Sequence, residues 1–145
     1  MARVVVSIDI EASPEAVWVE LEQLERHSEW MSDAEEIRFT TESTRGVGTV
    51  IEVLTKVGPF KLNDVMRFTE WEPAKTMAVD HRGIVTGTGA FVLEPTLIGT
   101  RMTWDETLTF PWYFGGGLTA LFAVPVLKAI WRGNLRRLAA SIEDT

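Results

Sequence analysis

The sequence predicts an α+β fold in which one antiparallel β-sheet is covered by a long C-terminal helix. Short segments of alternating apolar and polar residues follow one another through the middle of the chain, joined by connections of a few residues. Such connections favour antiparallel pairing, because a parallel crossover needs about a dozen residues or more. The last part of the chain instead repeats apolar residues at helical spacing. Since 145 residues match the length of an average domain, we expect a single domain over residues 1–145.

The N-terminal segment predicts a strand followed by two short helices. Valine and isoleucine alternate with polar residues from 3 to 10. Ser13 can then cap a helix, Pro14 suits its first position, and Glu15 complements the helix dipole. Apolar residues at helical spacing continue as far as Leu24, and a second short helical piece is expected from 25 to 31.

Six further strands are expected, which gives seven with the first one. Turn residues such as Gly58, Pro59 and Gly83 separate them. The expected ranges are 36–40, 49–57, 60–72, 76–81, 84–94 and 100–110.

A long helix is expected from Leu118 towards the end of the chain. Lys128, Arg132 and Arg136 lie along one of its faces, and Pro125 is expected to kink the helix or to divide a short lead-in from the main part. The apolar stripe on another face consists of Leu121, Phe122, Leu127, Trp131, Leu135, Leu138 and Ile142.

Composition excludes several classes of function. The formal net charge of −7 argues against a protein that binds nucleic acid through phosphate contacts. Cysteine is absent and there are only two histidines, so neither a thiolate nucleophile nor a metal site is expected, and no cofactor is indicated. The first residues lack the apolar block of a secretory signal, which makes a cytoplasmic protein the default expectation.

Several short motifs carry a family resemblance. They are Ser13-Pro14-Glu15-Ala16-Val17-Trp18, Trp30, Gly46-Val47-Gly48-Thr49, Leu93-Glu94-Pro95 and Gly99-Thr100-Arg101-Met102-Thr103-Trp104. With the order of elements, they make nearly the whole chain resemble the polyketide cyclase/dehydratase-like branch of the START/SRPBCC superfamily. The resemblance implies a helix-grip fold: a curved seven-stranded antiparallel sheet wraps the C-terminal helix, with two short helices between strands 1 and 2 and a deep apolar cavity. Members bind or transport lipids, sterols, polyketides and aromatic compounds, and a minority are enzymes; the motifs specify the fold rather than the activity.

Strand alternation places three ionisable side chains on the apolar face of the expected sheet. They are Asp64, His81 and Glu106, and Asn134 lies within the helical stripe. An inward carboxylate is costly to desolvate unless it is paired or used. Cyclisation or dehydration of a polyketide-like chain needs a base, for which Asp64 or Glu106 is the candidate, and a donor, for which His81 or Asn134 is the candidate. Structural alternatives stay open for each residue. The two carboxylates could be solvated, the histidine could lie at an exposed strand end, and the asparagine could bond only to backbone.

A hydrophobic ligand would contact the inward apolar residues of the strands and of the last helix. The residues expected to bind it are Val53, Leu62, Met66, Phe68, Met77, Phe91, Trp104, Leu108, Trp131, Asn134 and Leu135.

The segment between the last strand and the long helix is rich in aromatic residues and is followed by the glycines 115–117. Trp112, Tyr113 and Phe114 are expected to form an entrance lid, or a patch that contacts a membrane or a second copy of the chain. The alternative is that these rings fold down into the core. Residues 107 to 127 carry no charge, but proline and glycine interrupt this run, which favours a pocket rim over a membrane span.

Three functions are consistent with these features. The first is binding or transport of a small hydrophobic ligand in an internal cavity. The second is a cyclase/dehydratase-type enzyme that uses an inward carboxylate and no metal. The third is a non-catalytic interaction or stress-related module, in which two copies could pair as a homodimer. An apolar cavity leaves no sequence motif for its ligand.

Overall fold

The computed structural model describes residues 1–115 and 117–144; Gly116 of the glycine segment and Thr145 lie outside the described residues. The elements in chain order are β1 (Ala2–Ile10), α1 (Pro14–Leu21), η1 (Leu24–Arg26), α2 (His27–Trp30), β2 (Ala34–Phe39), β3 (Val50–Val57), β4 (Phe60–Glu72), β5 (Thr76–Arg82), β6 (Thr86–Pro95), β7 (Thr100–Thr109), η2 (Trp112–Phe114) and α3 (Gly117–Glu143). Each expected strand and helix is present, with ends shifted by one or two residues in most cases.

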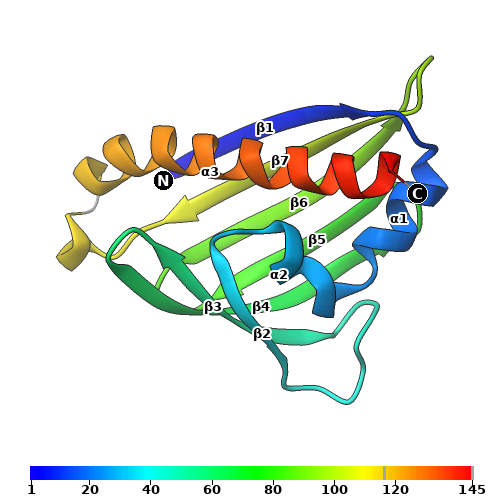
Figure 1. Cartoon of the computed structure of the whole chain (residues 1–145). Coiled ribbons are helices and arrows are strands. Elements are labelled where there is room, and N and C mark those ends of the chain that lie inside the picture. The colour runs from blue at the N-terminus through cyan, green and yellow to red at the C-terminus, as the bar shows by residue number, and fades with distance from the viewer. Residues whose placement is uncertain (116, 145) are drawn as a thin grey trace.

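The seven strands form one antiparallel sheet in the order β1-β7-β6-β5-β4-β3-β2. The N-terminal strand therefore pairs with the last strand, and all other pairs join neighbours in sequence. Figure 1 shows α3 lying across one face of the curved sheet, while α1 and α2 lie near the C-terminal half of α3. The predicted fold class is confirmed: seven antiparallel strands, a long C-terminal helix, and two short α-helices between β1 and β2.

The first helix begins as the sequence predicts. The Ser13 side chain accepts a hydrogen bond from the backbone N–H of Ala16 at 3.2 Å, Pro14 occupies the first turn, and Glu15 adds an acidic group there. The cap and the proline together fix where the chain leaves β1 and turns towards the sheet. This turn brings Val17 and Leu21 into the core, where both are fully buried.

The core is concentrated under the C-terminal half of α3. Trp131, Leu135 and Leu138 are buried there against the sheet. In the N-terminal half of α3 the predicted apolar stripe is not buried: Leu121 and Phe122 are 68% and 67% exposed. The residues of this half that face the cavity recur every three or four positions, and all but the exposed Val126 are partly buried: Thr119, Ala123, Val126 and Leu127. Leu121 and Phe122 lie between these positions and so point outward.

Pro125 does not divide α3, which runs as one helix from Gly117 to Glu143. Within the described residues, no helix combines the length and the hydropathy that a membrane crossing requires.

Candidate functional site

The inner face of the sheet and the N-terminal half of α3 enclose a cavity of about 720 Å³. Ligand-binding pockets commonly measure roughly 300–1,000 Å³, so the space matches a small organic molecule. The wall is mostly aliphatic and aromatic and comes from β3, β4, β5, β6 and β7 on one side and from α3 on the other. On the α3 side, Thr119 and Ala123 are too small to reach the sheet, which leaves the space open.

The mouth of the cavity can be located from wall residues that are also exposed. Phe60 is 71% exposed, and Ile84, Tyr113, Phe114 and Val126 are exposed as well. They come from the start of β4, the β5–β6 connection, η2 and the N-terminal half of α3, which meet at one end of the molecule (Figure 1). The cavity therefore opens at this end.

The aromatic segment before α3 lies at the mouth and does not fold into the core. Tyr113 and Phe114 line the cavity, whereas Trp112 is 85% exposed and does not. Their rings contact one another in sequence, with centroids 5.8 Å and 5.1 Å apart.

The opposite end of the cavity is closed by an aromatic cluster. Phe91 packs edge-on against Trp104 with ring centroids 5.0 Å apart, and Trp30 lies 6.0 Å from Phe91. His27 is buried beside them, and its Nε2–H donates to the carbonyl of Leu21 at 2.7 Å. Burial lowers the pKa of His27 to about 4, although the hydrogen bond to Leu21 opposes this shift, so the ring is uncharged at neutral pH.

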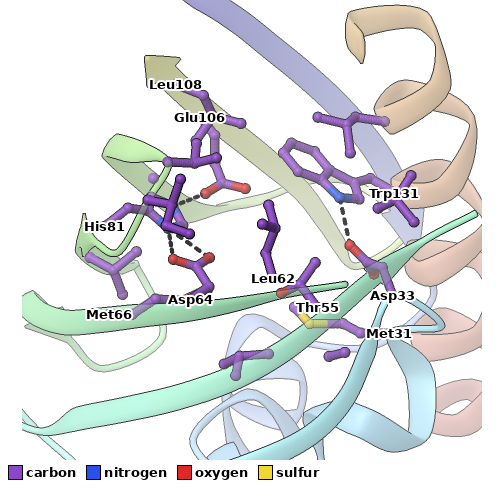
Figure 2. Close-up of a pocket in the computed structure, with 18 of the residues that line it drawn as sticks. Met31, Asp33, Thr55, Leu62, Asp64, Met66, His81, Glu106, Leu108 and Trp131 are labelled. Atoms are coloured by element: carbon purple, nitrogen blue, oxygen red, sulfur yellow. Dashed lines mark hydrogen bonds and ion pairs between the residues drawn. The ribbon is translucent and has the colours of Figure 1, made fainter. Parts of the chain in front are cut away.

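Three ionisable residues meet on the sheet wall between these two ends. Figure 2 shows His81 between Asp64 and Glu106. The Nδ1 atom of His81 lies 3.1 Å from Oδ2 of Asp64, and its Nε2 is hydrogen-bonded to Oε1 of Glu106. The indole N–H of Trp104 donates to the other oxygen of Glu106 at 2.9 Å. The three residues that alternation placed inward therefore form one hydrogen-bonded cluster that lines the cavity.

Glycines in β6 make this cluster possible. His81 is on β5 and Glu106 on β7, and β6 lies between them with Gly87 opposite His81 and Gly89 opposite Glu106. A Cβ atom on Gly89 would lie 2.6 Å from both Cγ and Oε1 of Glu106. The two side chains reach one another across β6 because no side chain stands between them.

The cluster keeps its imidazole protonated. Burial by itself lowers the pKa of His81, but the hydrogen bonds to Asp64 and Glu106 and the charges of both carboxylates outweigh it and raise the pKa to about 10. His81 is therefore an imidazolium at neutral pH, and each of its N–H groups points to a carboxylate. Across the described residues, no three His, Asp or Glu side chains are arranged to hold a metal ion.

A second carboxylate site lies on the α3 side of the cavity. Asp33, in the α2–β2 connection, lines the cavity and accepts from the indole N–H of Trp131 at 3.2 Å (Figure 2). The rings of Trp131 and Trp104 stack with centroids 4.4 Å apart and planes 5° from parallel. Asp33 was not predicted from the sequence, because a residue in a connection has no strand or helix period that could indicate where it points.

The structure places Asn134 and Leu135 differently from the expected ligand contacts. Neither lines the cavity, because α3 turns both towards the packed core. Asn134 donates to Oδ1 of Asp33 at 2.8 Å and accepts from the backbone N–H of Ser32 at 3.0 Å, so it holds the α2–β2 connection against α3. The other expected residues on the cavity wall are Val53, Leu62, Met66, Phe68, Met77, Phe91, Trp104, Leu108 and Trp131.

A sequence model of the family described as polyketide cyclase/dehydrase and lipid transport matches residues 1–143. No curated protein matches the sequence.

Solved structures with a similar fold have low sequence identity. TTHA0849 from Thermus thermophilus superposes with a TM-score of 0.82 at 21% identity, covering 97% of this chain and 96% of that chain. The Zhui aromatase/cyclase from Streptomyces sp. R1128 superposes with a TM-score of 0.70 at 17% identity, and the match covers 97% of this chain and 93% of that chain. The di-domain ARO/CYC StfQ from the steffimycin biosynthetic pathway gives 0.78 at 16% identity; the match covers 99% of this chain and 51% of StfQ, so this chain spans about half of that protein. The TM-scores establish a shared fold, and at identities this low the likeness shows the fold alone.

The two histidines should titrate on opposite sides of neutral pH. The imidazole NMR signals of His27 should move near pH 4, and those of His81 should stay unchanged until about pH 10. Because the pKa of His81 is raised above its ordinary value of 6.5, its contribution to stability is complete below pH 6.5 and is lost as the pH rises towards 10. The depressed pKa of His27 lowers stability as the pH falls from 6.5 towards 4. Chemical denaturation across this range checks both slopes; a His81 signal that titrates near 6.5 would contradict the cluster.

Replacing Gly89 with alanine should break the cluster. The new Cβ would occupy the space of the Glu106 carboxylate, so we expect a loss of about 1–3 kcal/mol of unfolding free energy. The titration midpoint of His81 should also fall. Gly133→Ala is the matched control, because a Cβ there meets only Arg137 at 3.5 Å and the helix should gain about 0.5–1 kcal/mol. Unchanged titration of His81 in Gly89→Ala would show that the glycine does not position Glu106.

Proposed function

Because the chain belongs to the polyketide cyclase/dehydrase and lipid transport family, we propose that it binds a small hydrophobic molecule in the cavity beneath α3. The observation that carries the proposal is the cavity itself: about 720 Å³ of space with a largely apolar wall and an open mouth. An apolar ligand that leaves water for this wall gains about 25 cal/mol for each Å² of surface buried. The Zhui aromatase/cyclase and the di-domain ARO/CYC protein StfQ share the fold, which favours an aromatic or polyketide-like ligand.

We propose that the ligand enters between η2 and the β3–β4 turn. Tyr113 and Phe114 line this mouth, and Gly115 follows them with a φ of 93°, a left-handed conformation that glycine adopts without strain. Exposed apolar side chains extend from Trp112 onto the outer face of α3 at Leu121 and Phe122. The same outer face continues into the basic residues Lys128, Arg132 and Arg136, which supports contact with an anionic membrane surface during ligand transfer.

A second candidate function is acid–base catalysis in the same cavity. It is favoured by the Asp64–His81–Glu106 cluster, which presents a protonated imidazole and two carboxylates to the ligand space. Such groups can remove a proton next to a carbonyl and protonate a leaving hydroxyl, as cyclisation or dehydration requires. A catalytic cluster is distinguished from a purely binding one if Glu106→Gln abolishes conversion of a poly-β-ketone thioester while the affinity for a neutral dye stays unchanged.

Filling the cavity should abolish ligand binding. Leu62 points into the space from β4, so Leu62→Trp should weaken the binding of the neutral dye Nile red at least about tenfold, a loss of about 1.4 kcal/mol. Val65→Trp is the control, because Val65 has the opposite parity on the same strand and does not line the cavity. Fluorescence titration measures both. Equal affinity in the two variants would place the dye outside the cavity and contradict the proposal.

The apolar patch at the mouth should promote membrane binding. Trp112→Ser combined with Phe122→Ser removes two of its exposed rings, and we expect the double variant to reduce sedimentation with anionic liposomes several-fold. Leu97→Ser is the control, because Leu97 is fully exposed in the β6–β7 turn, away from the mouth. Light scattering tests the competing explanation: a dimer that dissociates in the double variant, with no change in liposome binding, would overturn the membrane assignment.

A further inference from the structure

The ionisable groups on the cavity wall are dominated by carboxylates. Asp33, Asp64 and Glu106 contribute three acidic groups. His81 and Lys61 carry the positive charges of the wall in the described part of the chain, because the third basic residue, His27, is uncharged at neutral pH. His81 is buried between two of the carboxylates, so its charge offsets only one of them. The Lys61 side chain is 56% exposed and faces Glu35 at 3.5 Å, which places its charge in water at the mouth. The interior of the cavity is therefore net negative.

The imidazolium and indole N–H groups of the cavity wall are already engaged with these carboxylates. Both N–H groups of His81 point to Asp64 and Glu106. The indole N–H groups of Trp104 and Trp131 point to Glu106 and Asp33. The threonine hydroxyls and the Asn63 amide of the wall carry no charge and can donate or accept. A ligand that enters therefore meets charged acceptors rather than charged donors.

Of the two carboxylates of the cluster, Asp64 is the one that a ligand can reach. Its side chain is 19% exposed, compared with 7% for Glu106 and 5% for His81. Its two oxygens share one N–H of His81, at 3.1 and 3.3 Å, whereas a carboxylate has about four acceptor sites. Figure 2 shows its carboxylate on the cavity side of β4, and Asp33 across the space. The unused acceptor capacity of Asp64 faces the cavity.

We infer that the cavity selects hydrophobic molecules whose polar end is a neutral or cationic hydrogen-bond donor, such as a hydroxyl or an amine, and rejects molecules that end in a carboxylate. The inference rests on the proposed ligand-binding function. A donor group placed against Asp64 replaces the water that solvates this oxygen. An anion in the same place loses its hydration and meets like charges in a low-dielectric space, which is strongly unfavourable. The ligand enters with its polar end inward and its apolar tail towards the aromatic mouth.

Competition between matched ligands tests this inference. Dodecanol, dodecylamine and dodecanoate have the same chain length and differ only in the polar end. At neutral pH the alcohol and the amine should each displace Nile red at concentrations at least about tenfold lower than dodecanoate. Asp64→Asn should reduce this preference several-fold, because it removes the charge and keeps the size. Glu70→Gln, which changes an exposed carboxylate of the same strand that lies outside the cavity, should leave the preference unchanged.

The outcomes separate the two proposals. If Nile red fails to bind, or if none of the three ligands displaces it, the proposed ligand-binding function itself is wrong. If Nile red binds and dodecanoate competes as well as the alcohol or better, ligand binding stands and the selectivity for donors is overturned. The comparison of ligands on the unaltered protein decides this even if Asp64→Asn does not fold. A folded Asp64→Asn with unchanged preference would remove Asp64 from the recognition of the polar end.

Discussion

The stacked pair of Trp104 and Trp131 is the contact on which the division of the interior depends. It joins β7 to the middle of α3, with planes 5° from parallel. On its C-terminal side, Leu135 and Leu138 pack against the sheet and fill the interior. On its N-terminal side, α3 continues over the sheet with small residues facing it, and the interior is hollow. Each indole also donates its N–H to a carboxylate of the cavity wall, so the same two rings close the core and orient Glu106 and Asp33.

The cluster on the sheet wall shows how the fold tolerates buried charge. Removing two carboxylates and an imidazolium from water is costly, and their mutual attraction compensates only when the geometry satisfies every proton. Here each imidazolium proton has a carboxylate partner, and Trp104 satisfies a further oxygen of Glu106. The missing side chain at Gly89 provides the space for this arrangement. A fold that needed only a packed interior would reach the same stability with apolar side chains, so the cluster is consistent with the proposed ligand-binding role of the cavity.

The sequence predicted the fold closely and the site in part, and the difference has a physical cause. Strand alternation and short connections determine an antiparallel sheet, and the same parity placed Asp64, His81 and Glu106 on one face. Parity does not show which side chains of one face touch, because that depends on register and on gaps such as Gly89 in the strand between them. Asp33 lies in a connection, where no period exists. The prediction that Leu121 and Phe122 belong to the inward stripe of α3 was wrong, because that stripe was assigned from large apolar residues and both side chains are exposed.

That last failure explains why a cavity is difficult to read from sequence. Hydrophobic patterns identify residues that fill space, whereas a cavity is created by residues that leave space unfilled. In α3 the positions that face the sheet at the open end carry Thr119 and Ala123, while the large side chains of the same turns point outward. An ordinary amphipathic helix would show the reverse distribution, with its large residues inward. The combination of small residues on the sheet-facing side and exposed large residues on the other therefore indicates a hollow interior with an apolar rim. Both features arise from one stretch of helix, which couples the cavity to the surface around its mouth.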